Sequence, residues 1–164
     1  MLSIEVNMVN IRKILFPTDF SEYSLAALDF AGDLTDRYMA QLHCVHVVDL
    51  VDNMLLGGYM PTMVIPPVAI DQIEEVAKQN LDDFVKKHFS PIENSIIKKI
   101  IIGKPFVEII CYCRQENIDL IVLGTHGHSA LASMLLGSVA EKVVRKAPCP
   151  VLTVRHPEHK FVAP

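Results

Sequence analysis

Short apolar runs alternate with longer amphipathic segments along the chain, and this alternation constrains the fold more than any other feature of the sequence. The run Ile11–Phe16, closed by Pro17, is typical of a buried strand. From Ser21 to about Met39 the apolar residues recur at helical spacing, with Ser21 as the predicted N-cap. The same reading predicts strands at Gln41–Val48, Ile96–Ile102, Leu120–Leu123 and Pro150–Val154, and helices with a buried face from Ile70 to Val85, from about Pro105 to Gln115, and from Gly137 to Lys146.

Strands separated by helices are joined by right-handed crossovers and form a mainly parallel sheet with helices on both faces. The expected fold class is therefore α/β, a three-layer sandwich around a five-stranded, Rossmann-like sheet. A chain of 164 residues is expected to form a single domain over residues 1–164, with 156–164 as a loose tail. Such sheets bind ligands beyond the carboxyl ends of their strands, near the reversal of strand order. This rule selects the loops after the first and fourth strands.

Composition narrows the class of partner. The formal net charge of −4 argues against nucleic acid, which binds to basic surfaces. The longest uncharged run, Asn53–Ile70, is interrupted by glycines and prolines, so no membrane span is expected. The four cysteines match neither a zinc pattern nor Cys-x-x-Cys, and the N-terminus lacks the features of a secretion signal. These observations predict a cytoplasmic protein with reduced thiols.

The loop after the fourth strand carries glycines suited to an anion. Gly124 and Gly127 are followed by nine residues and then by Gly137-Ser138 at the start of a helix. Successive amides and a helix N-terminus favour phosphate, and no carboxylate occurs from Leu120 to Ala140. The alternative is that these glycines only end a strand, turn the chain and begin a helix. The chain lacks both Gly-x-Gly-x-x-Gly and the P-loop motif.

Several motifs in order resemble the ATP-binding branch of the universal stress protein family, over a core of about residues 11–155. They are Ile14-Leu-Phe-Pro-Thr-Asp19, His46-Val-Val-Asp49, Leu123-Gly-Thr-His-Gly-His128, Leu135-Leu-Gly-Ser-Val-Ala-Glu-Lys-Val143 and Ala147-Pro-Cys-Pro-Val-Leu152. The resemblance implies a single-domain, five-stranded parallel fold of the adenine nucleotide α-hydrolase-like kind. It further implies that ATP with Mg²⁺ is held by Pro17, Thr18, Asp19, Val47, Gly124, Gly127, His128, Gly137, Ser138 and Val139.

For three of these positions the residues themselves leave an alternative open. Asp19 is expected near the ribose and the metal-bound phosphates, but an aspartate also suits a helix cap near Ser21. His128 either reaches a phosphate or is a solvated loop residue. Val47, whose backbone the resemblance places near adenine, is also a candidate core residue.

Other clusters are discounted as sites. Thr125-His-Gly-His128 matches a nucleotidylyltransferase signature, but that signature follows the first strand rather than the fourth. His43 and His46 are expected on opposite faces of a strand, and Cys111 and Cys113 diverge on a helix, so neither pair predicts a metal site. The methionine-rich segment 49–67 either packs on the sheet edge or forms a flap sensitive to nucleotide or partner.

The function expected is a regulatory, stress-response protein that holds ATP and acts through conformation or an unidentified protein partner. The resemblance also implies a homodimer through the last strand, Val151, Leu152, Thr153 and Val154. The alternative is a slow ATP hydrolase or nucleotidyl transferase that uses Asp19 or His128. A nucleotide-free interaction module is the third possibility.

Overall fold

The computed structural model describes residues 9–50, 67–90, 92–125 and 136–156. Its strands are β1 (Lys13–Pro17), β2 (Gln41–Val48), β3 (Ile97–Ile102), β4 (Leu120–Gly124) and β5 (Val151–Val154). Its helices are α1 (Glu22–Tyr38), α3 (Pro67–His88), α4 (Pro105–Glu116) and α5 (Ser138–Lys146), with a short 3₁₀ helix, η1 (Glu93–Ser95).

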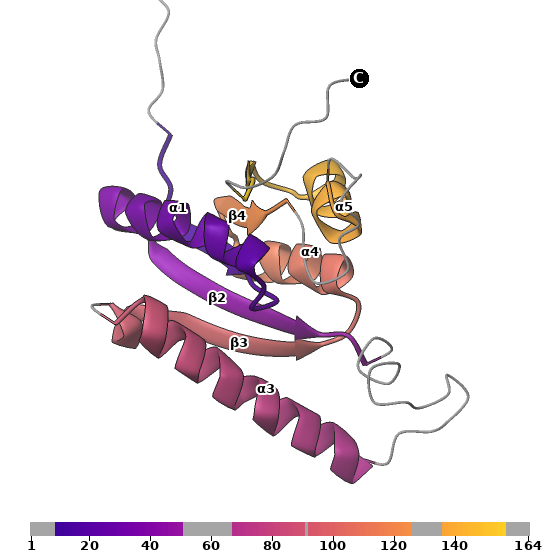
Figure 1. Ribbon diagram of the computed structural model, residues 1–164. Helices are drawn as coiled ribbons and strands as arrows, with labels where there is room; N and C mark the ends of the chain where they lie inside the picture. The colour runs from indigo at the N-terminus through magenta and orange to yellow at the C-terminus, as the bar shows by residue number, and fades with distance from the viewer. Residues whose placement is uncertain (1–8, 51–66, 91, 126–135, 157–164) are drawn as a thin grey trace, which may run out of the picture.

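All five strands form one parallel sheet in the order β3-β2-β1-β4-β5. The chain leaves β1 toward β2 on one side, whereas β4 pairs with β1 on the other, so the strand order reverses between β1 and β4. The predicted α/β class, with a five-stranded parallel sheet, is confirmed (Figure 1). The predicted strand and helix limits agree with the observed ones to within two residues, except that α3 extends three residues beyond the predicted buried face at each end.

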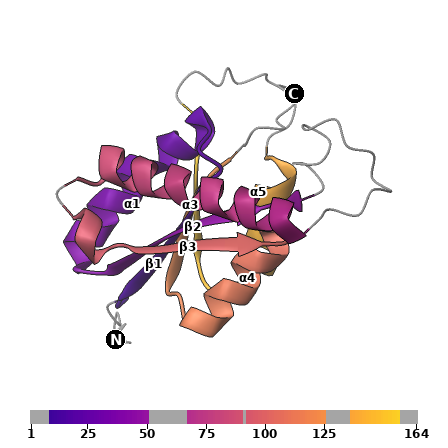
Figure 2. The ribbon, with the colours of Figure 1, turned by 90° about the horizontal axis from the view of Figure 1, so that it is seen from below.

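Helices cover both faces of the sheet, and each face has its own core. One core packs Ala27 and Ala31 of α1 and Phe84 of α3 against Ile14 and Phe16 of β1. The second core, on the opposite face, is formed by α4 and α5 against residues that include Leu15, Val45 and Ile121. Figure 2 shows α1 and α3 on one side of the strands and α4 on the other.

The side chains along each strand point alternately into these two cores. Because successive side chains of a strand point to opposite faces, a strand buried on both sides contains an unbroken apolar run. Ile14, Leu15 and Phe16 are all fully buried. The short apolar runs that predicted the strands therefore follow from the two helical layers.

Local sequence signals fix the helix ends. Ser21 is the N-cap of α1, as predicted, and its side chain accepts a hydrogen bond from the Ser24 amide. Met39 and Asn117 end α1 and α4 in the left-handed conformation, with φ of 50° and 53°. Pro105 lies in the first turn of α4, where its missing N–H costs no hydrogen bond.

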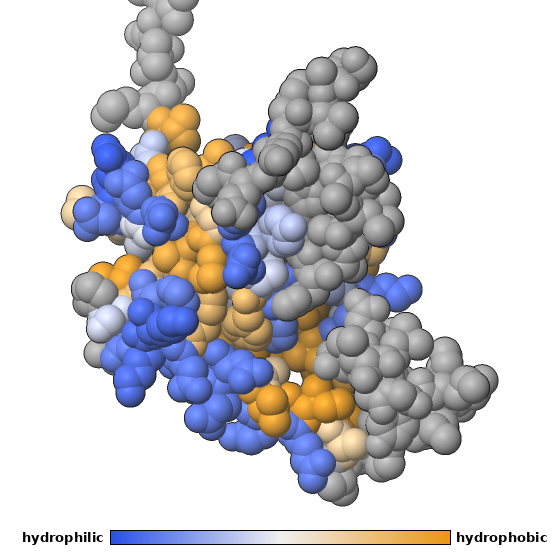
Figure 3. All heavy atoms as spheres, in the orientation of Figure 1, coloured by the Kyte–Doolittle hydropathy of each residue, from blue (hydrophilic) through white to orange (hydrophobic). Residues whose placement is uncertain are grey.

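Hydrophilic side chains gather over the outer side of α3 (Figure 3). They include Lys78, which forms an ion pair of 3.1 Å with Glu74 on the same helix. Among the described residues, none of the helices combines the length and apolarity needed to cross a bilayer.

Candidate functional site

The loop after β1 is tied to its surroundings by Thr18. The Thr18 amide donates to the Val45 carbonyl at 2.9 Å, and the buried hydroxyl lies 3.0 Å from the Ser24 hydroxyl. The same hydroxyl accepts from the amide of Phe20, which has a φ of 64°. The Thr18 side chain therefore holds a left-handed turn between β1 and α1.

Asp19 braces the start of α1 without capping it. Its Oδ1 accepts from the Ser21 amide at 3.1 Å and from the Ser21 hydroxyl at 2.6 Å. Ser21 in turn accepts from the Ser24 amide and is the N-cap. The capping alternative thus applies to Ser21, while half-buried Asp19 orients that cap from the loop at the end of β1.

Gly124, the last residue of β4, lies against the first turn of α1. A Cβ at this position would come within 2.8 Å of the Tyr23 carbonyl carbon and 3.2 Å of the Ser24 nitrogen, and closer still to the Tyr23 oxygen. No side chain fits that space, because these are backbone atoms of a helix that packs on the sheet. The close approach brings the loop after β4 beside the loop after β1.

The two described ends of the glycine loop meet at Thr125 and Gly137. The Gly137 amide donates to the Thr125 carbonyl at 2.7 Å, and the Thr125 amide donates to the Val154 carbonyl at 3.0 Å. Gly137 is the N-cap of α5, with φ −66° and ψ 157°. The first helical bond runs from Glu141 to Gly137, so the amides of Ser138 and Val139 have no carbonyl partner within the helix.

The structure therefore gathers most of the described candidate residues at the carboxyl ends of β1 and β4. Pro17 is buried at the end of β1, Ser138 is exposed and Val139 is half-buried. Glu141, the acidic residue of the first turn of α5, is paired with Arg145 at 2.9 Å. Gly127, His128 and residues 51–66 of the methionine-rich segment lie outside the described residues.

Val47 and His46 at the end of β2 face opposite cores. Val47 packs partly buried on the α4 and α5 face, which agrees with the core alternative for its side chain. His46 was predicted only to point away from His43. Its Nδ1 lies 2.8 Å from the Thr18 carbonyl oxygen, and its ring lies 4.4 Å from that of Phe20.

His46 thus links β2 to the candidate loop, and sequence reasoning missed that role. The available signal was the motif that begins at His46 and spans the end of β2. His43 lies on the α4 face, where its Nδ1 is 2.9 Å from the Tyr112 hydroxyl. The predicted opposite orientation of the two histidines is confirmed.

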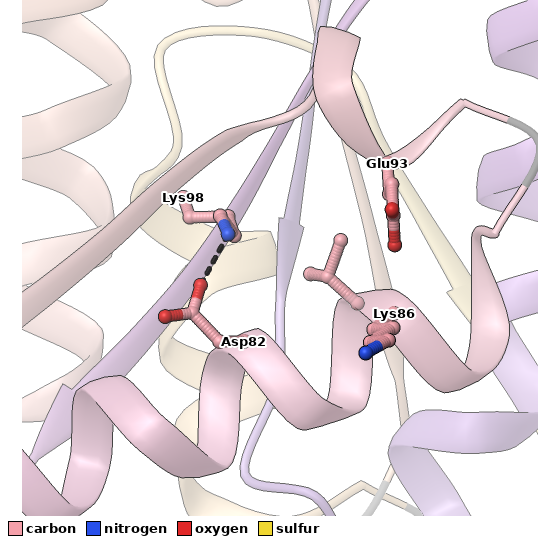
Figure 4. Close-up of a pocket in the computed structure, with 5 residues that line it drawn as sticks. Asp82, Lys86, Glu93 and Lys98 are labelled. Carbon is pink, nitrogen blue, oxygen red and sulfur yellow. Dashed lines mark hydrogen bonds and ion pairs between the residues drawn. The ribbon is translucent and has the colours of Figure 1, made fainter.

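A pocket of about 220 Å³ lies elsewhere, between α3 and the amino end of β3. It is lined by Asp82, Val85, Lys86, Glu93 and Lys98 (Figure 4). The Asp82 carboxylate and the Lys98 ammonium are joined in an ion pair. Because the pocket opens at the amino end of β3, it contains none of the predicted site residues.

Comparisons with known proteins agree with this fold and its motifs. The model of the universal stress protein family matches residues 10–155. Universal stress protein MJ0531 of Methanocaldococcus jannaschii is 33% identical over 147 residues, covering 90% of this chain and 84% of its own length. Universal stress protein YxiE of Bacillus subtilis is 34% identical over 149 residues, covering 88% and 99%.

Solved structures give the same result. The structure of protein MJ0577 superimposes with a TM-score of 0.75 at 29% identity, covering 92% of this chain and 99% of the other. A universal stress protein in complex with cAMP gives 0.60 at 25% identity, covering 89% and 98%. With the family model spanning nearly all of the described core and relatives above 30% identity, the chain belongs to the universal stress protein family.

Proposed function

We propose that this chain is a regulatory protein that binds ATP together with Mg²⁺ where β1 and β4 end. The observation that carries the proposal is the hydrogen bond between Gly137 and Thr125, because it places the first turn of α5 beside the end of β4. Amides of a helix N-terminus are suited to phosphate oxygens. A relative that binds the adenine nucleotide cAMP supports the class of ligand.

Each candidate residue has a part in the proposed complex. The loop of Gly124, Gly127 and Gly137 wraps the phosphates, the amides of Ser138 and Val139 donate to them, and the Ser138 hydroxyl and His128 add donors. Asp19, Thr18 and Pro17 lie beside the ribose and the metal, and the backbone of Val47 faces adenine. Mg²⁺ prefers one or two carboxylates together with substrate phosphates, and Asp19 supplies such a carboxylate.

Binding is favoured over catalysis by the hydrogen bonds of Asp19. Its Oδ1 already accepts from the amide and hydroxyl of Ser21, so this oxygen is engaged in orienting the start of α1. The chain is proposed to change conformation with its nucleotide and to signal through a protein partner in the cytoplasm. Phosphate release from ATP would be the sign of the alternative, a slow hydrolase.

A homodimer through β5 is part of the proposal. The carbonyls of Pro150 and Val154 accept from Ile121 and Thr125 of the β4 side. Because the polar groups of a strand alternate in direction, those of Val151 and Thr153 point away from β4, toward the edge of the sheet. An edge strand with such groups can pair with a second copy across a twofold axis.

Mass spectrometry of the purified protein after denaturation tests the proposed ligand. We expect an adenine nucleotide to be released from the wild-type chain, or to be retained after incubation with ATP and Mg²⁺ and desalting. The Gly137→Val variant, purified in parallel, is expected to release little. A wild-type preparation that retains no nucleotide under either condition would contradict the proposal.

A further inference from the structure

Two cysteines that are far apart in the sequence meet on the face covered by α4 and α5. Cys113 lies in α4 and Cys149 lies between α5 and β5, and their Sγ atoms are 3.3 Å apart. The other two cysteines are elsewhere: Cys44 is buried in the opposite core, and Cys111 is exposed. The contact therefore joins one specific pair of thiols.

The surroundings of the pair hold it in place. Cys113 is 1% exposed, among Ile109, Tyr112 and Ile118 of the same core. Cys149 is partly exposed and is thus the more open of the two residues. It stands between Pro148 and Pro150, whose rings restrict the backbone of this short connection. A sulfur–sulfur bond needs about 2.05 Å, so a shift of about 1 Å between the two side chains is enough.

The two thiols differ in acidity. The hydrogen bond from the Cys113 thiol lowers the pKa of Cys149, although burial and the nearby Asp119 carboxylate oppose this effect. The same hydrogen bond and burial raise the pKa of Cys113, against a smaller opposing effect of Arg114. Cys149 is thus both the more accessible sulfur and the one that becomes a thiolate more readily, which is the form that attacks electrophiles.

We propose that Cys113 and Cys149 form a reversible disulfide when the protein meets a peroxide. The Cys149 thiolate attacks a peroxide oxygen, the O–O bond breaks, and a sulfenic acid forms as hydroxide leaves and takes up a proton to give water. The Cys113 sulfur then attacks the Cys149 sulfur. The S–O bond breaks, the S–S bond forms, and the hydroxyl leaves as water with the Cys113 proton.

Overall, two thiols and one hydrogen peroxide give one disulfide and two waters. A small thiol reductant reverses the step by two thiol–disulfide exchanges. The bond spans a separation of 36 residues that contains β4, the glycine loop and α5. It fixes the end of α4 to the segment that enters β5. The inference does not depend on nucleotide binding.

Peptide mapping by mass spectrometry, after treatment of the whole protein with hydrogen peroxide and blocking of free thiols, tests the proposal. In the wild-type chain we expect a linked peptide pair containing Cys113 and Cys149, a fall from four free thiols to two, and full reversal by dithiothreitol. The thermal midpoint should rise by about 5 to 15 °C on oxidation.

Three variants sharpen the test. Cys111→Ser is the matched control and should form the same linked pair, because Cys111 is exposed on α4 and the sulfur that meets Cys149 is that of Cys113. Cys149→Ser should form no disulfide within the chain. Cys113→Ser should leave Cys149 as a sulfenic acid that dimedone traps.

The wild-type mapping does not depend on how the variants fold. If peroxide oxidises Cys111 in the wild-type protein while Cys113 and Cys149 remain unlinked, the proposal is overturned. Loss of two thiols within a folded Cys149→Ser chain would overturn it as well.

Discussion

Gly124 at the end of β4 lies so close to Tyr23 in α1 that a Cβ would come within 2.8 Å of the Tyr23 carbonyl carbon. The contact joins the last residue of a central strand to the first turn of a helix on the sheet. It gives this glycine a structural role that does not depend on any ligand. The same contact brings together the loops after β1 and β4, so packing and the candidate site share one residue.

Replacing Gly124 with alanine is expected to destabilise the fold. The added methyl group meets helix backbone that cannot move alone, so the free energy of unfolding should fall by about 2 to 3 kcal/mol. Gly32→Ala is the matched control within α1. Its Cβ would lie 3.9 Å from the Phe89 ring, so helix propensity should raise stability by about 1 kcal/mol. Urea unfolding measures both values, and equal stabilities for the two variants would refute the packing role.

Asp19→Ala is expected to weaken ATP binding mainly when Mg²⁺ is present. Loss of one carboxylate near the metal should cost about tenfold in affinity with Mg²⁺, and less without it. Ser21→Ala removes the N-cap and serves as the control. It should lower the free energy of unfolding by about 1 kcal/mol and change the Mg²⁺ dependence little. Calorimetric titrations with ATP, with and without Mg²⁺, measure these affinities. If Asp19→Ala loses the same affinity in both conditions, Asp19 has only a structural role.

His43 should make the stability depend on pH. Burial, and then the charge of Lys13, lower the pKa of His43 in the folded protein. The unfolded chain takes up a proton near its ordinary pKa of about 6.5, so stability is greatest above that pH. Between the ordinary and the lowered pKa, stability should fall by up to about 1.4 kcal/mol for each unit by which the pH drops.

His43→Gln tests this dependence. In urea unfolding from about pH 7.5 to about pH 5.5, this variant should show a smaller slope of stability against pH than the wild type. His88, whose pKa burial also lowers, is less enclosed, so His88→Gln should retain most of the slope. If both variants keep the wild-type slope, His43 does not account for the effect.

Thr153→Pro should separate the proposed dimer. Proline removes the N–H that points away from β4, and its ring obstructs a partner strand, so dimer affinity should fall by about 100-fold or more. Thr153→Val keeps the N–H and should remain dimeric. Light scattering measures the mass in solution, and circular dichroism checks that the monomer stays folded. A dimeric, folded Thr153→Pro chain would exclude pairing through β5.

The fold could be predicted because each strand carries an apolar run and each helix an amphipathic period. Burial on both faces makes Ile14, Leu15 and Phe16 consecutive apolar residues, and such a run is visible without tertiary information. The first and last residues of each helix are harder to predict, because helix caps depend on single side chains. Ser21 was correctly predicted as the N-cap, whereas the contact that braces it from Asp19 became clear only from the structure.

The parts of the site that could not be predicted arise from contacts between distant segments. No local pattern indicates that Gly124 touches Tyr23, and the motif that begins at His46 does not specify the bond of this histidine to the Thr18 carbonyl. Cys113 and Cys149 are 36 residues apart and match no motif, so spacing alone compares Cys113 only with Cys111, a pair that diverges on the helix. Such pairs depend on how helices pack across the sheet, and local sequence patterns carry no record of that packing.

Isothermal titration of the purified protein with ATP and Mg²⁺ tests the central claim, a nucleotide site where β1 and β4 end, most directly. We predict saturable binding to the wild type. The φ and ψ of Gly137 suit any residue, so Gly137→Val should stay folded. Its affinity for ATP should nevertheless fall by about 100-fold or more. Lys98→Ala, in the pocket between α3 and β3, should bind like the wild type. Unchanged affinity in Gly137→Val, or loss of binding in Lys98→Ala, would contradict the account.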